Sequence, residues 1–250
     1  WRRIEVVHAR SYVPALLALA LKRLVGTPFL FDMRGFWPDE KVAAGEWREG
    51  TARYCAAKWC ERQLLLEADV IVSLTQAAVE AMRQFLYLRG LAVRFEVIPT
   101  CADLELFRAE TRNGEVHPFT LGYLGSVGGR YRFDAVLDCF MTLRALRPGA
   151  RLRILNHGGH TAIRKALQVR GVPEACVELS AEDRVGVAHA LQQVDAGILF
   201  YRAGFSTLGT APTRLGELLA SGIPCLANAG SGATERLLER LGKTANNQEF

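Results

Sequence analysis

The chain has 250 residues, of which 50% are hydrophobic and 23% are charged, so it can bury one large core or two smaller ones. Its net charge of +5 favours anionic partners, but the basic residues are scattered and form no Lys/Arg-rich tract that would indicate a nucleic-acid partner. The longest nearly apolar run, residues 13–21, is shorter than the roughly 20 residues needed to span a bilayer.

The six cysteines form no CxxC pair and have no Cys/His spacing typical of zinc. We interpret them as buried thiols in a reducing compartment, which predicts a cytoplasmic protein. The sequence starts at Trp1, which is not an initiator residue, and residues 4–9 already have the pattern of a strand. We therefore expect a missing segment before Trp1 and an N-terminal domain that is incomplete.

Strand-like runs alternate with helical patterns along the whole chain. In the first half we expect strands at residues 4–9, 28–34, 69–74 and 94–99, with helices at 13–24, 51–68 and 76–86. In the second half we expect strands at residues 119–125, 150–156, 175–180, 194–200 and 223–229, separated by helix-length segments. Short strands rich in Val, Ile, Leu and Phe are typical of parallel sheets with crossover helices on both faces. The sequence therefore predicts an α/β protein.

A polar stretch, residues 108–118, interrupts the alternation with an Asn-Gly pair and a proline. We therefore predict two doubly wound domains that face one another, residues 1–112 and residues 113–250. In open α/β sheets, ligands bind outside the carboxyl ends of the strands, where loops lead into helix N-termini. The candidate residues are accordingly those that follow strands.

A glycine-rich loop follows the strand expected at residues 119–125. Gly125, Gly128 and Gly129 would let the backbone approach a phosphate closely, and the following helix N-terminus has free N–H groups. Arg130 and Arg132 could bind the same anion bidentately. The spacing is that of neither a P-loop nor a GxGxxG fingerprint, which disfavours a nicotinamide enzyme. A turn with only a structural purpose is the alternative.

A second candidate is the helix start near Pro212, which suits a first helical position. The N–H groups of Thr213, Arg214 and Leu215 would then be free for an anion. The carboxylate of Glu217 could accept two hydrogen bonds from a vicinal diol such as a ribose. In the alternative interpretation, Glu217 only complements the helix dipole.

A third candidate is the loop expected at residues 31–40, which combines charges with aromatic rings. Arg34 and Trp37 lie in it, and an aromatic face is a good platform for a sugar or a lipid-linked acceptor. His8 ends the preceding strand and could reach the same region, although a histidine there is more often structural. Further along, we interpret Glu61 and Glu67 as solvent-facing residues of an amphipathic helix.

Several stretches taken together resemble the retaining family 4 glycosyltransferases, whose GT-B architecture has two Rossmann-like domains. "PTRLGELLASGIPCLANAG" after "FTLGYLGSVGG" is similar to the nucleotide-sugar half of that family. The first half is similar to the acceptor-side domain, in order and spacing, through "VVHARSY", "GTPFLFDMRGFWPDE", "EADVIVSLTQAAVEAM" and "VIPTCADLELF". The resemblance covers nearly the whole chain.

The resemblance implies roles for named residues. Glu217 would hold the donor ribose, and the donor diphosphate would rest on Thr213 to Leu215 and on Gly125 to Gly129. Arg130 or Arg132 would stabilise the departing diphosphate, and Asp32 would orient or deprotonate the acceptor hydroxyl.

This sequence departs from the family pattern at one position. The family often has a second acidic residue eight positions before the ribose-binding one, and here that position is Gly209. We therefore expect backbone groups or the hydroxyls of Ser206 and Thr207 to contact the donor sugar instead.

The sequence thus predicts a hexosyltransferase-like enzyme in surface polysaccharide or glycoconjugate synthesis, with retention and with neither metal nor cofactor. The expected partners are a nucleotide-sugar donor and a saccharide or lipid-linked acceptor, with peripheral association at the inner face of the membrane and no nucleic acid. Two alternatives stay open. One is a nucleotide-sugar-binding or partner module without turnover, and the other is a nucleotide-sugar epimerase of the same architecture.

Overall fold

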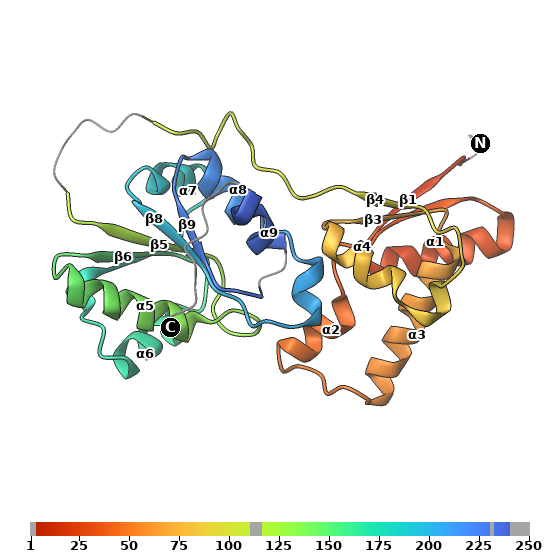
Figure 1. Cartoon of the computed structure of the whole chain (residues 1–250), viewed down its shortest axis with the longest axis horizontal. Coiled ribbons are helices and arrows are strands. Elements are labelled where there is room, and N and C mark those ends of the chain that lie inside the picture. Colours follow the sequence, from red (N-terminus) through yellow and green to blue (C-terminus); the bar gives the residue numbers. More distant parts are fainter. Residues whose placement is uncertain (1–3, 111–116, 231–232, 241–250) are drawn as a thin grey trace. The chain divides into compact units, whose positions relative to one another are not determined.

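A computed structural model describes residues 4–110, 117–230 and 233–240; the middle of the expected linker, residues 111–116, lies outside this described part. The chain divides into two compact units (Figure 1). Unit 1 comprises Trp1–Pro99 and Ala203–Ala211, and unit 2 comprises Thr100–Arg202 and Pro212–Phe250. The division therefore falls earlier than the expected one at residues 112 and 113, and unit 1 also includes a segment from the second half of the sequence.

Unit 1 is built on a four-stranded sheet in which all neighbouring strands run parallel, in the order β1-β2-β3-β4. The strands are β1 (Val7–Arg10), β2 (Phe29–Asp32), β3 (Val70–Ser73) and β4 (Phe95–Val97). The α-helices are α1 (Tyr12–Val25), α2 (Trp37–Ala43), α3 (Ala52–Glu67) and α4 (Gln76–Arg83), and short 3-10 helices lie at Leu86–Leu88 and Phe205–Gly209.

Local sequence explains where these elements begin and end. Helix α1 ends at Gly26, whose φ of 75° is the left-handed conformation that glycine adopts readily. Helix α4 begins after Thr75, whose Oγ1 accepts a hydrogen bond of 3.0 Å from the Ala78 amide. In β2, Phe29 and Phe31 are both buried in the core of the unit, as the period of two requires.

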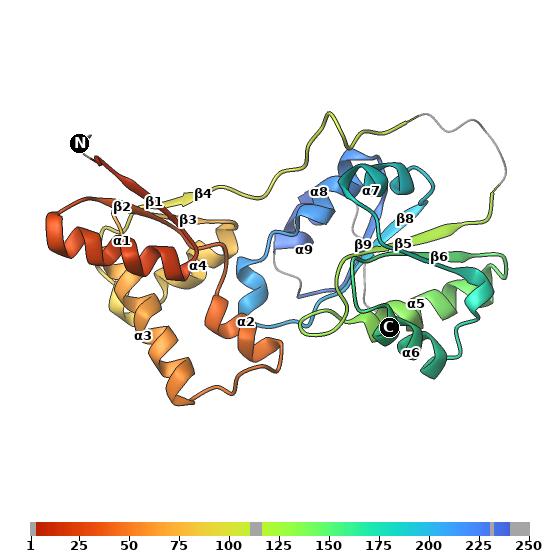
Figure 2. The same cartoon turned by 180° about the vertical axis from the view of Figure 1, so that it is seen from behind.

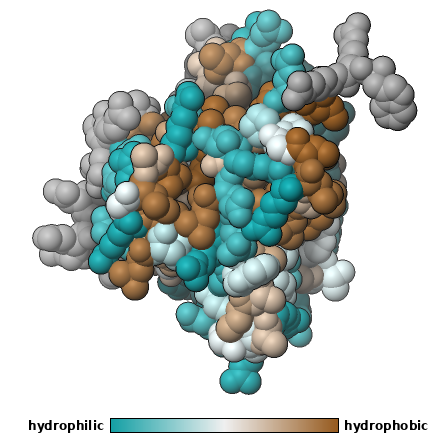
Figure 3. Space-filling view, turned by 90° about the vertical axis from the view of Figure 1, so that its right-hand side faces the viewer, coloured by the Kyte–Doolittle hydropathy of each residue, from teal (hydrophilic) through white to brown (hydrophobic). Residues whose placement is uncertain are grey.

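Helix α1 has an apolar stripe that faces solvent. Val13, Leu17 and Leu24 lie on the same side of the helix, and their exposed fractions are 67%, 71% and 81%. The space-filling view from the right-hand side of Figure 1 shows hydrophobic patches separated by hydrophilic residues (Figure 3). Tyr12, Ala15 and Leu19, on the opposite side of α1, enter the core.

Unit 2 is built on a five-stranded parallel sheet with the strand order β7-β6-β5-β8-β9. The strands are β5 (Thr120–Leu124), β6 (Arg151–Leu155), β7 (Val177–Ser180), β8 (Ala196–Leu199) and β9 (Cys225–Ala227). The helices are α5 (Phe133–Leu146), α6 (His160–Val169), α7 (Arg184–Leu191), α8 (Thr213–Ala220) and α9 (Ala233–Arg240), with a 3-10 helix at Glu174–Cys176.

Helices cover both faces of this sheet: α5 and α6 lie on one face and α7 and α8 on the other (Figures 1 and 2). Two separate cores result. Neighbouring residues of β8 alternate between them, because Ile198 packs with α5 and α6 whereas Leu199 packs with α7 and α8. Unit 2 is thus the doubly wound α/β unit that the sequence predicted.

The structure corrects two interpretations of single residues. Glu61, expected to face solvent, is fully buried in unit 1 with an exposed fraction of 0%. All six cysteines are free, but only Cys176 and Cys225 are buried, whereas Cys55 and Cys101 are exposed. The expectation of buried thiols therefore holds for only part of the set.

Candidate functional site

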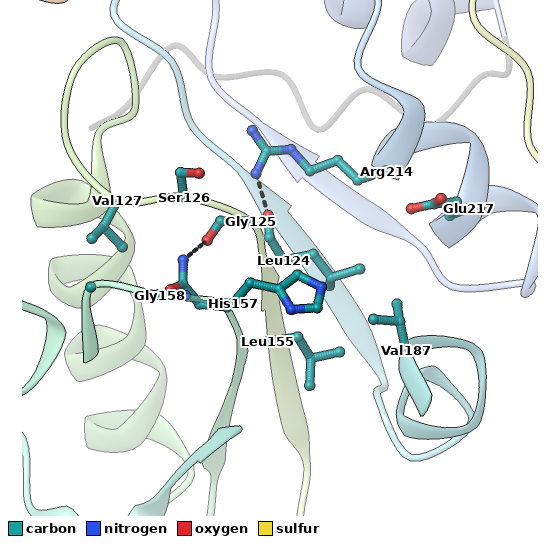
Figure 4. Close-up of a pocket in the computed structure, with 12 residues that line it drawn as sticks. Leu124, Gly125, Ser126, Val127, Leu155, His157, Gly158, Val187, Arg214 and Glu217 are labelled. Atoms are coloured by element: carbon teal, nitrogen blue, oxygen red, sulfur yellow. Dashed lines mark hydrogen bonds between the residues drawn. The ribbon is translucent and has the colours of Figure 1, made fainter. Parts of the chain in front are cut away.

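A cavity of about 470 Å³ lies at the carboxyl edge of the unit 2 sheet (Figure 4). It is lined by the loop after β5, the loop after β6, and residues of α7 and α8. The lining residues are Leu124, Gly125, Ser126, Val127, Leu155, Asn156, His157, Gly158, Gly159, Val187, Arg214 and Glu217. This is the position at which open α/β sheets bind ligands, and it brings together Gly125, Arg214 and Glu217 from the predicted donor site.

The loop after β5 presents backbone amides to the cavity. Gly125 donates its own amide to Leu155 O at 3.0 Å. Ser126 and Val127 line the cavity, and among the described residues no group accepts a hydrogen bond from their amides. Gly128 and Gly129, which were predicted to face the diphosphate, do not line it. Successive free amides at a helix-leading loop are suited to binding an anion.

Asn156 connects the two loops that line the cavity, and sequence reasoning missed it. Its Nδ2 donates to Gly125 O at 2.6 Å, and its Oδ1 accepts from the Gly158 amide at 2.8 Å. The side chain is buried, with an exposed fraction of 6%, so these bonds are shielded from water. A polar residue at the carboxyl end of a predicted buried strand is the signal that could have identified Asn156.

Arg214 provides the positive charge of the cavity. Its Nε and Nη2 donate to Tyr201 Oη at 3.3 and 2.9 Å, and its Nη1 donates to Leu124 O. The guanidinium also lies 4.4 Å from the centre of the Tyr131 ring. The phenol of Tyr201 and the carbonyl of Leu124 thus fix the guanidinium in the cavity wall. The sequence analysis assigned Arg214 only through its backbone amide, and both tyrosines were missed.

The charge of Arg214 also acts on Tyr131. Burial alone would raise the pKa of the Tyr131 phenol, but the cations of Arg214 and Arg130 offset it and lower the pKa overall. The guanidinium is thus electrostatically dominant in this part of unit 2.

Glu217 is half-buried in the cavity wall, one turn along α8 from Arg214 (Figure 4). Burial raises the pKa of its carboxyl group above the usual value, although Arg184 and Arg214 act in the opposite direction. Among the described residues, none donates a hydrogen bond to this carboxylate or pairs with it. Its oxygens are therefore available to a ligand.

The start of α8 differs in part from the expectation. Pro212 precedes the first helical residue, Thr213, which is exposed. Leu215, however, donates its amide to Pro212 O at 3.0 Å, and its side chain is buried. The predicted role of the Leu215 amide in binding a diphosphate is therefore wrong, whereas Thr213 and Arg214 occupy first-turn positions where the helix provides no partner.

Arg130 and Arg132 do not line the cavity. The Arg132 side chain pairs with Asp134 at 3.5 Å, and its amide donates to Phe200 O at 3.0 Å. Arg130 O in turn accepts from the Arg202 amide at 2.8 Å. The loop is thus fixed to the segment after β8, and in unit 2 it is Arg214 that brings a guanidinium to the cavity wall.

The structure places Ser206 and Thr207 in unit 1, with the segment 203–211. Their exposed fractions are 4% and 2%, and Thr207 Oγ1 donates to Gly204 O at 2.6 Å. Gly209 packs against the 35–36 turn, since a Cβ at this position would lie 3.0 Å from Gly35 Cα. An acidic side chain at position 209 would therefore require the backbone at Gly35 to shift.

The acceptor-side residues of unit 1 are only partly brought together. Asp32 ends β2, and its Oδ2 lies 3.6 Å from His8 Nε2 and 3.5 Å from Arg10 Nε. Arg34 is exposed and has a φ of 62°, which is uncommon outside glycine. Trp37 is not an open platform, because its ring packs on Tyr12 and on Trp47 at ring-centre distances of 5.5 and 5.1 Å.

Within residues 4–110, 117–230 and 233–240, no three or more His, Cys, Asp or Glu side chains are arranged to hold a metal ion. No helix of this part of the chain is long and apolar enough to cross a membrane.

The fold and the cavity define an α/β protein with two Rossmann-like units, the second of which has a cavity lined by Arg214 and Glu217 at the carboxyl edge of its sheet. Solved structures share this fold. The chain is similar to sucrose-phosphate synthase from Thermosynechococcus elongatus, with a TM-score of 0.67 and 14% identity over 94% of this chain and 58% of that one. It is also similar to WaaG, a glycosyltransferase involved in lipopolysaccharide biosynthesis, with a TM-score of 0.66 and 16% identity over 90% and 65% of the two chains.

A third similar structure is the catalytic domain of starch synthase IV from Arabidopsis thaliana bound to ADP and acarbose, with a TM-score of 0.54 and 11% identity over 92% and 58% of the two chains. The chain thus spans between about half and two thirds of the length of these relatives. The likeness confirms the GT-B-type α/β fold expected from the sequence.

Residues 1–101 match the family model for the glycosyl transferase 4-like domain. The matched region includes all four strands of unit 1, from β1 to β4, but not its segment Ala203–Ala211. No curated protein matches the chain in sequence.

Proposed function

We propose that the chain transfers a sugar from a nucleoside diphosphate donor to an acceptor, with retention at the sugar. The observation that carries this proposal is the cavity of unit 2, in which the Arg214 guanidinium, the unpartnered Glu217 carboxylate and the free amides of Ser126 and Val127 line one space. The match of residues 1–101 to the glycosyl transferase 4-like domain supports the transferase class.

In the proposed donor complex, each group in the cavity wall has a distinct task. The Glu217 carboxylate accepts hydrogen bonds from the two ribose hydroxyls. The Arg214 guanidinium and the amides of Ser126 and Val127 bind the diphosphate. Because negative charge builds up on the departing diphosphate, these fixed donors lower the barrier for transfer, and the proposal requires no metal ion or cofactor.

In unit 1, we assign Asp32 to orient or deprotonate the acceptor hydroxyl. It lies at the carboxyl end of β2, where the side chains of His8 and Arg10 lie beside its carboxylate. The proposed acceptor is a saccharide or a lipid-linked saccharide. The proposed setting is hexose transfer in surface polysaccharide or glycoconjugate synthesis in the cytoplasm, with peripheral association at the membrane.

A second candidate is a nucleotide-sugar-binding module without turnover. The observation that favours it is Gly209, which stands where the resembled family often has an acidic residue and which packs closely against Gly35. Titration calorimetry with UDP-, GDP- and ADP-sugars, followed by an assay of nucleotide release with saccharide acceptors, separates the two. Binding with release supports the transferase, and binding without release under any acceptor supports the module.

Glu217→Gln tests the proposed donor site directly. Loss of the charged acceptor should weaken the binding of the preferred nucleotide sugar by roughly tenfold to a hundredfold, measured by calorimetry. Glu174→Gln, an exposed carboxylate in the same unit, is the control and should leave affinity unchanged.

The assignment of Glu217 also predicts that the affinity for the nucleotide sugar depends on pH. Burial raises the pKa of Glu217, so the wild-type protein should lose affinity as the pH falls through this raised pKa, where the carboxylate becomes protonated. Glu217→Gln should lack this particular loss. Equal affinity of the folded variant and the wild type at neutral pH would refute the assignment of Glu217.

A further inference from the structure

A second cavity, of about 270 Å³, lies in unit 1 between the end of α4 and the start of β4. Its lining includes Arg83 and Arg89 together with the apolar residues Leu88, Leu91 and Val93. Helices that follow parallel strands run back toward the amino ends of those strands. The cavity is therefore at the amino edge of the sheet, whereas Asp32 lies at the carboxyl edge.

Both arginines of this cavity lack an acidic partner. Among the described residues, neither Arg83 nor Arg89 forms an ion pair or donates a hydrogen bond to another group. Arg83 lies 5.8 Å from the centre of the Phe95 ring, which supports one side of its guanidinium. Two unpaired guanidinium groups beside one cavity are suited to a phosphate, whose oxygens match the planar arrangement of N–H groups.

Two leucines in this segment face solvent. Leu91, which lines the cavity, has an exposed fraction of 53%, and Leu86, two positions before the lining residue Leu88, has an exposed fraction of 77%. Gly90, with a φ of 78°, makes the turn that separates Leu91 from Arg89. Exposed leucines interleaved with arginines are typical of surfaces that insert into the boundary between lipid head groups and acyl chains. The cavity is also below the roughly 300–1,000 Å³ of pockets that enclose a whole small ligand, so it suits a head group.

We propose that this cavity binds the phosphate of an anionic phospholipid, with Leu86 and Leu91 inserted beside it. The inference names the surface that would serve the membrane association suggested under the proposed function, and it rests on that function only for its biological setting. Its test uses no nucleotide, so a failure here and a failure of the donor-site assignment are distinguishable.

The experiment is cosedimentation of the whole chain with vesicles of phosphatidylcholine containing phosphatidylglycerol, with pure phosphatidylcholine as the reference. The wild type should bind the anionic vesicles more tightly. The double variant Arg83→Gln/Arg89→Gln should bind them about tenfold to thirtyfold more weakly, since each basic residue near the surface contributes roughly 1 kcal/mol. Arg164→Gln/Lys165→Gln, on the exposed side of α6, removes the same net charge and should change binding by less than about threefold.

A second variant tests the exposed leucines without changing charge. Leu91→Ser should weaken vesicle binding, and it should leave the fluorescence-detected unfolding midpoint unchanged because Leu91 is exposed. Equal binding of the wild type to both kinds of vesicle would overturn the proposal. So would an equal loss in the α6 control variant, or binding of soluble glycerol phosphate that depends on Arg83 and Arg89 when vesicles do not bind.

Discussion

Gly125 has both an unusual backbone conformation and a close contact with the side chain of Arg214 in the candidate site. Its φ of 111° is one that other residues rarely adopt, and a Cβ there would overlap Arg214 Nη1. Gly125→Ala should therefore displace the guanidinium from Leu124 O and Tyr201. We expect unit 2 to lose about 2–4 kcal/mol of unfolding free energy, with weaker nucleotide binding, measured by chemical denaturation and calorimetry.

Gly128→Ala is the matched control for this substitution. Gly128 also has a positive φ, of 86°, but no atom lies within 4 Å of a Cβ added there. It should show only the backbone cost of about 1–2 kcal/mol. Equal effects of the two substitutions on nucleotide binding would show that the contact between Gly125 and Arg214 is unimportant.

A cluster of charged side chains, here called the Lys58 cluster, lies inside unit 1. Lys58 Nζ donates to Asp39 at 3.0 Å and also to Glu61, and Glu61 accepts a bond of 2.6 Å from Tyr12 Oη. Tyr54 Oη donates to Asp39 at 2.9 Å. Burial raises the pKa of Glu61 despite the opposing effect of Lys58, so this carboxylate depends on its partner to remain charged.

Lys58→Met should destabilise unit 1 at neutral pH by about 3–5 kcal/mol, because it leaves the Glu61 charge buried and unpaired. Without the lysine, the folded-state pKa of Glu61 rises further above its unfolded value. The folded protein then binds more protons than the unfolded one, so stability should recover as the pH falls through that pKa. Urea denaturation at neutral and mildly acidic pH measures both effects. A loss of stability that is the same at both values of pH would contradict this account of Glu61.

At the scale of elements, the strands were predictable because the two-residue and 3.6-residue periods alternate regularly. Each predicted strand has a counterpart in the structure, from β1 to β9. Helix α2 was not predicted, since its seven residues, Trp37–Ala43, include a proline and are too short to show a period. Its position depends on the packing of Trp37 against Tyr12, 25 positions earlier in the sequence.

The candidate site was predictable only as far as local patterns reach. Gly125 and Glu217 follow from a strand and a helix start that are visible in the sequence. The direction of the Arg214 side chain is different, because it depends on Leu124 and Tyr201, which are 90 and 13 positions away. Glu61 was misassigned for a similar reason, although Lys58, three positions earlier, was a visible signal of an ion pair.

At the scale of the whole molecule, the chain passes between the two units at three places: after Pro99, after Arg202 and after Ala211. The short segment 203–211 therefore belongs to unit 1 although the strand before it and the helix after it belong to unit 2. Within unit 1, Leu208 O accepts a hydrogen bond from Thr75 Oγ1, at the start of α4. A prediction that divides the chain at one point can only give two continuous domains. It therefore could not assign segment 203–211 to unit 1.

Phe205 attaches this segment to unit 1. Its ring centre lies 4.4 Å from that of Phe36 and 6.1 Å from that of Phe85, and Lys58 Nζ lies 5.9 Å from it. Phe36 is fully buried, whereas Phe205 has an exposed fraction of 40%, so Phe205 is the outer member of the stack. Through these ring contacts, Phe205 packs on the outside of the unit 1 core.

Phe205→Ala should therefore lower the unfolding free energy of unit 1 by about 1–3 kcal/mol, less than for a fully buried phenylalanine. All four tryptophans lie within residues 1–59, so the tryptophan fluorescence of the whole chain reports the unfolding of unit 1. Val185→Ala, at an exposed position of α7 in unit 2, is the control and should leave the fluorescence midpoint in place. If Phe205→Ala also leaves it in place, segment 203–211 adds no stability to unit 1, and its assignment to that unit has no energetic basis.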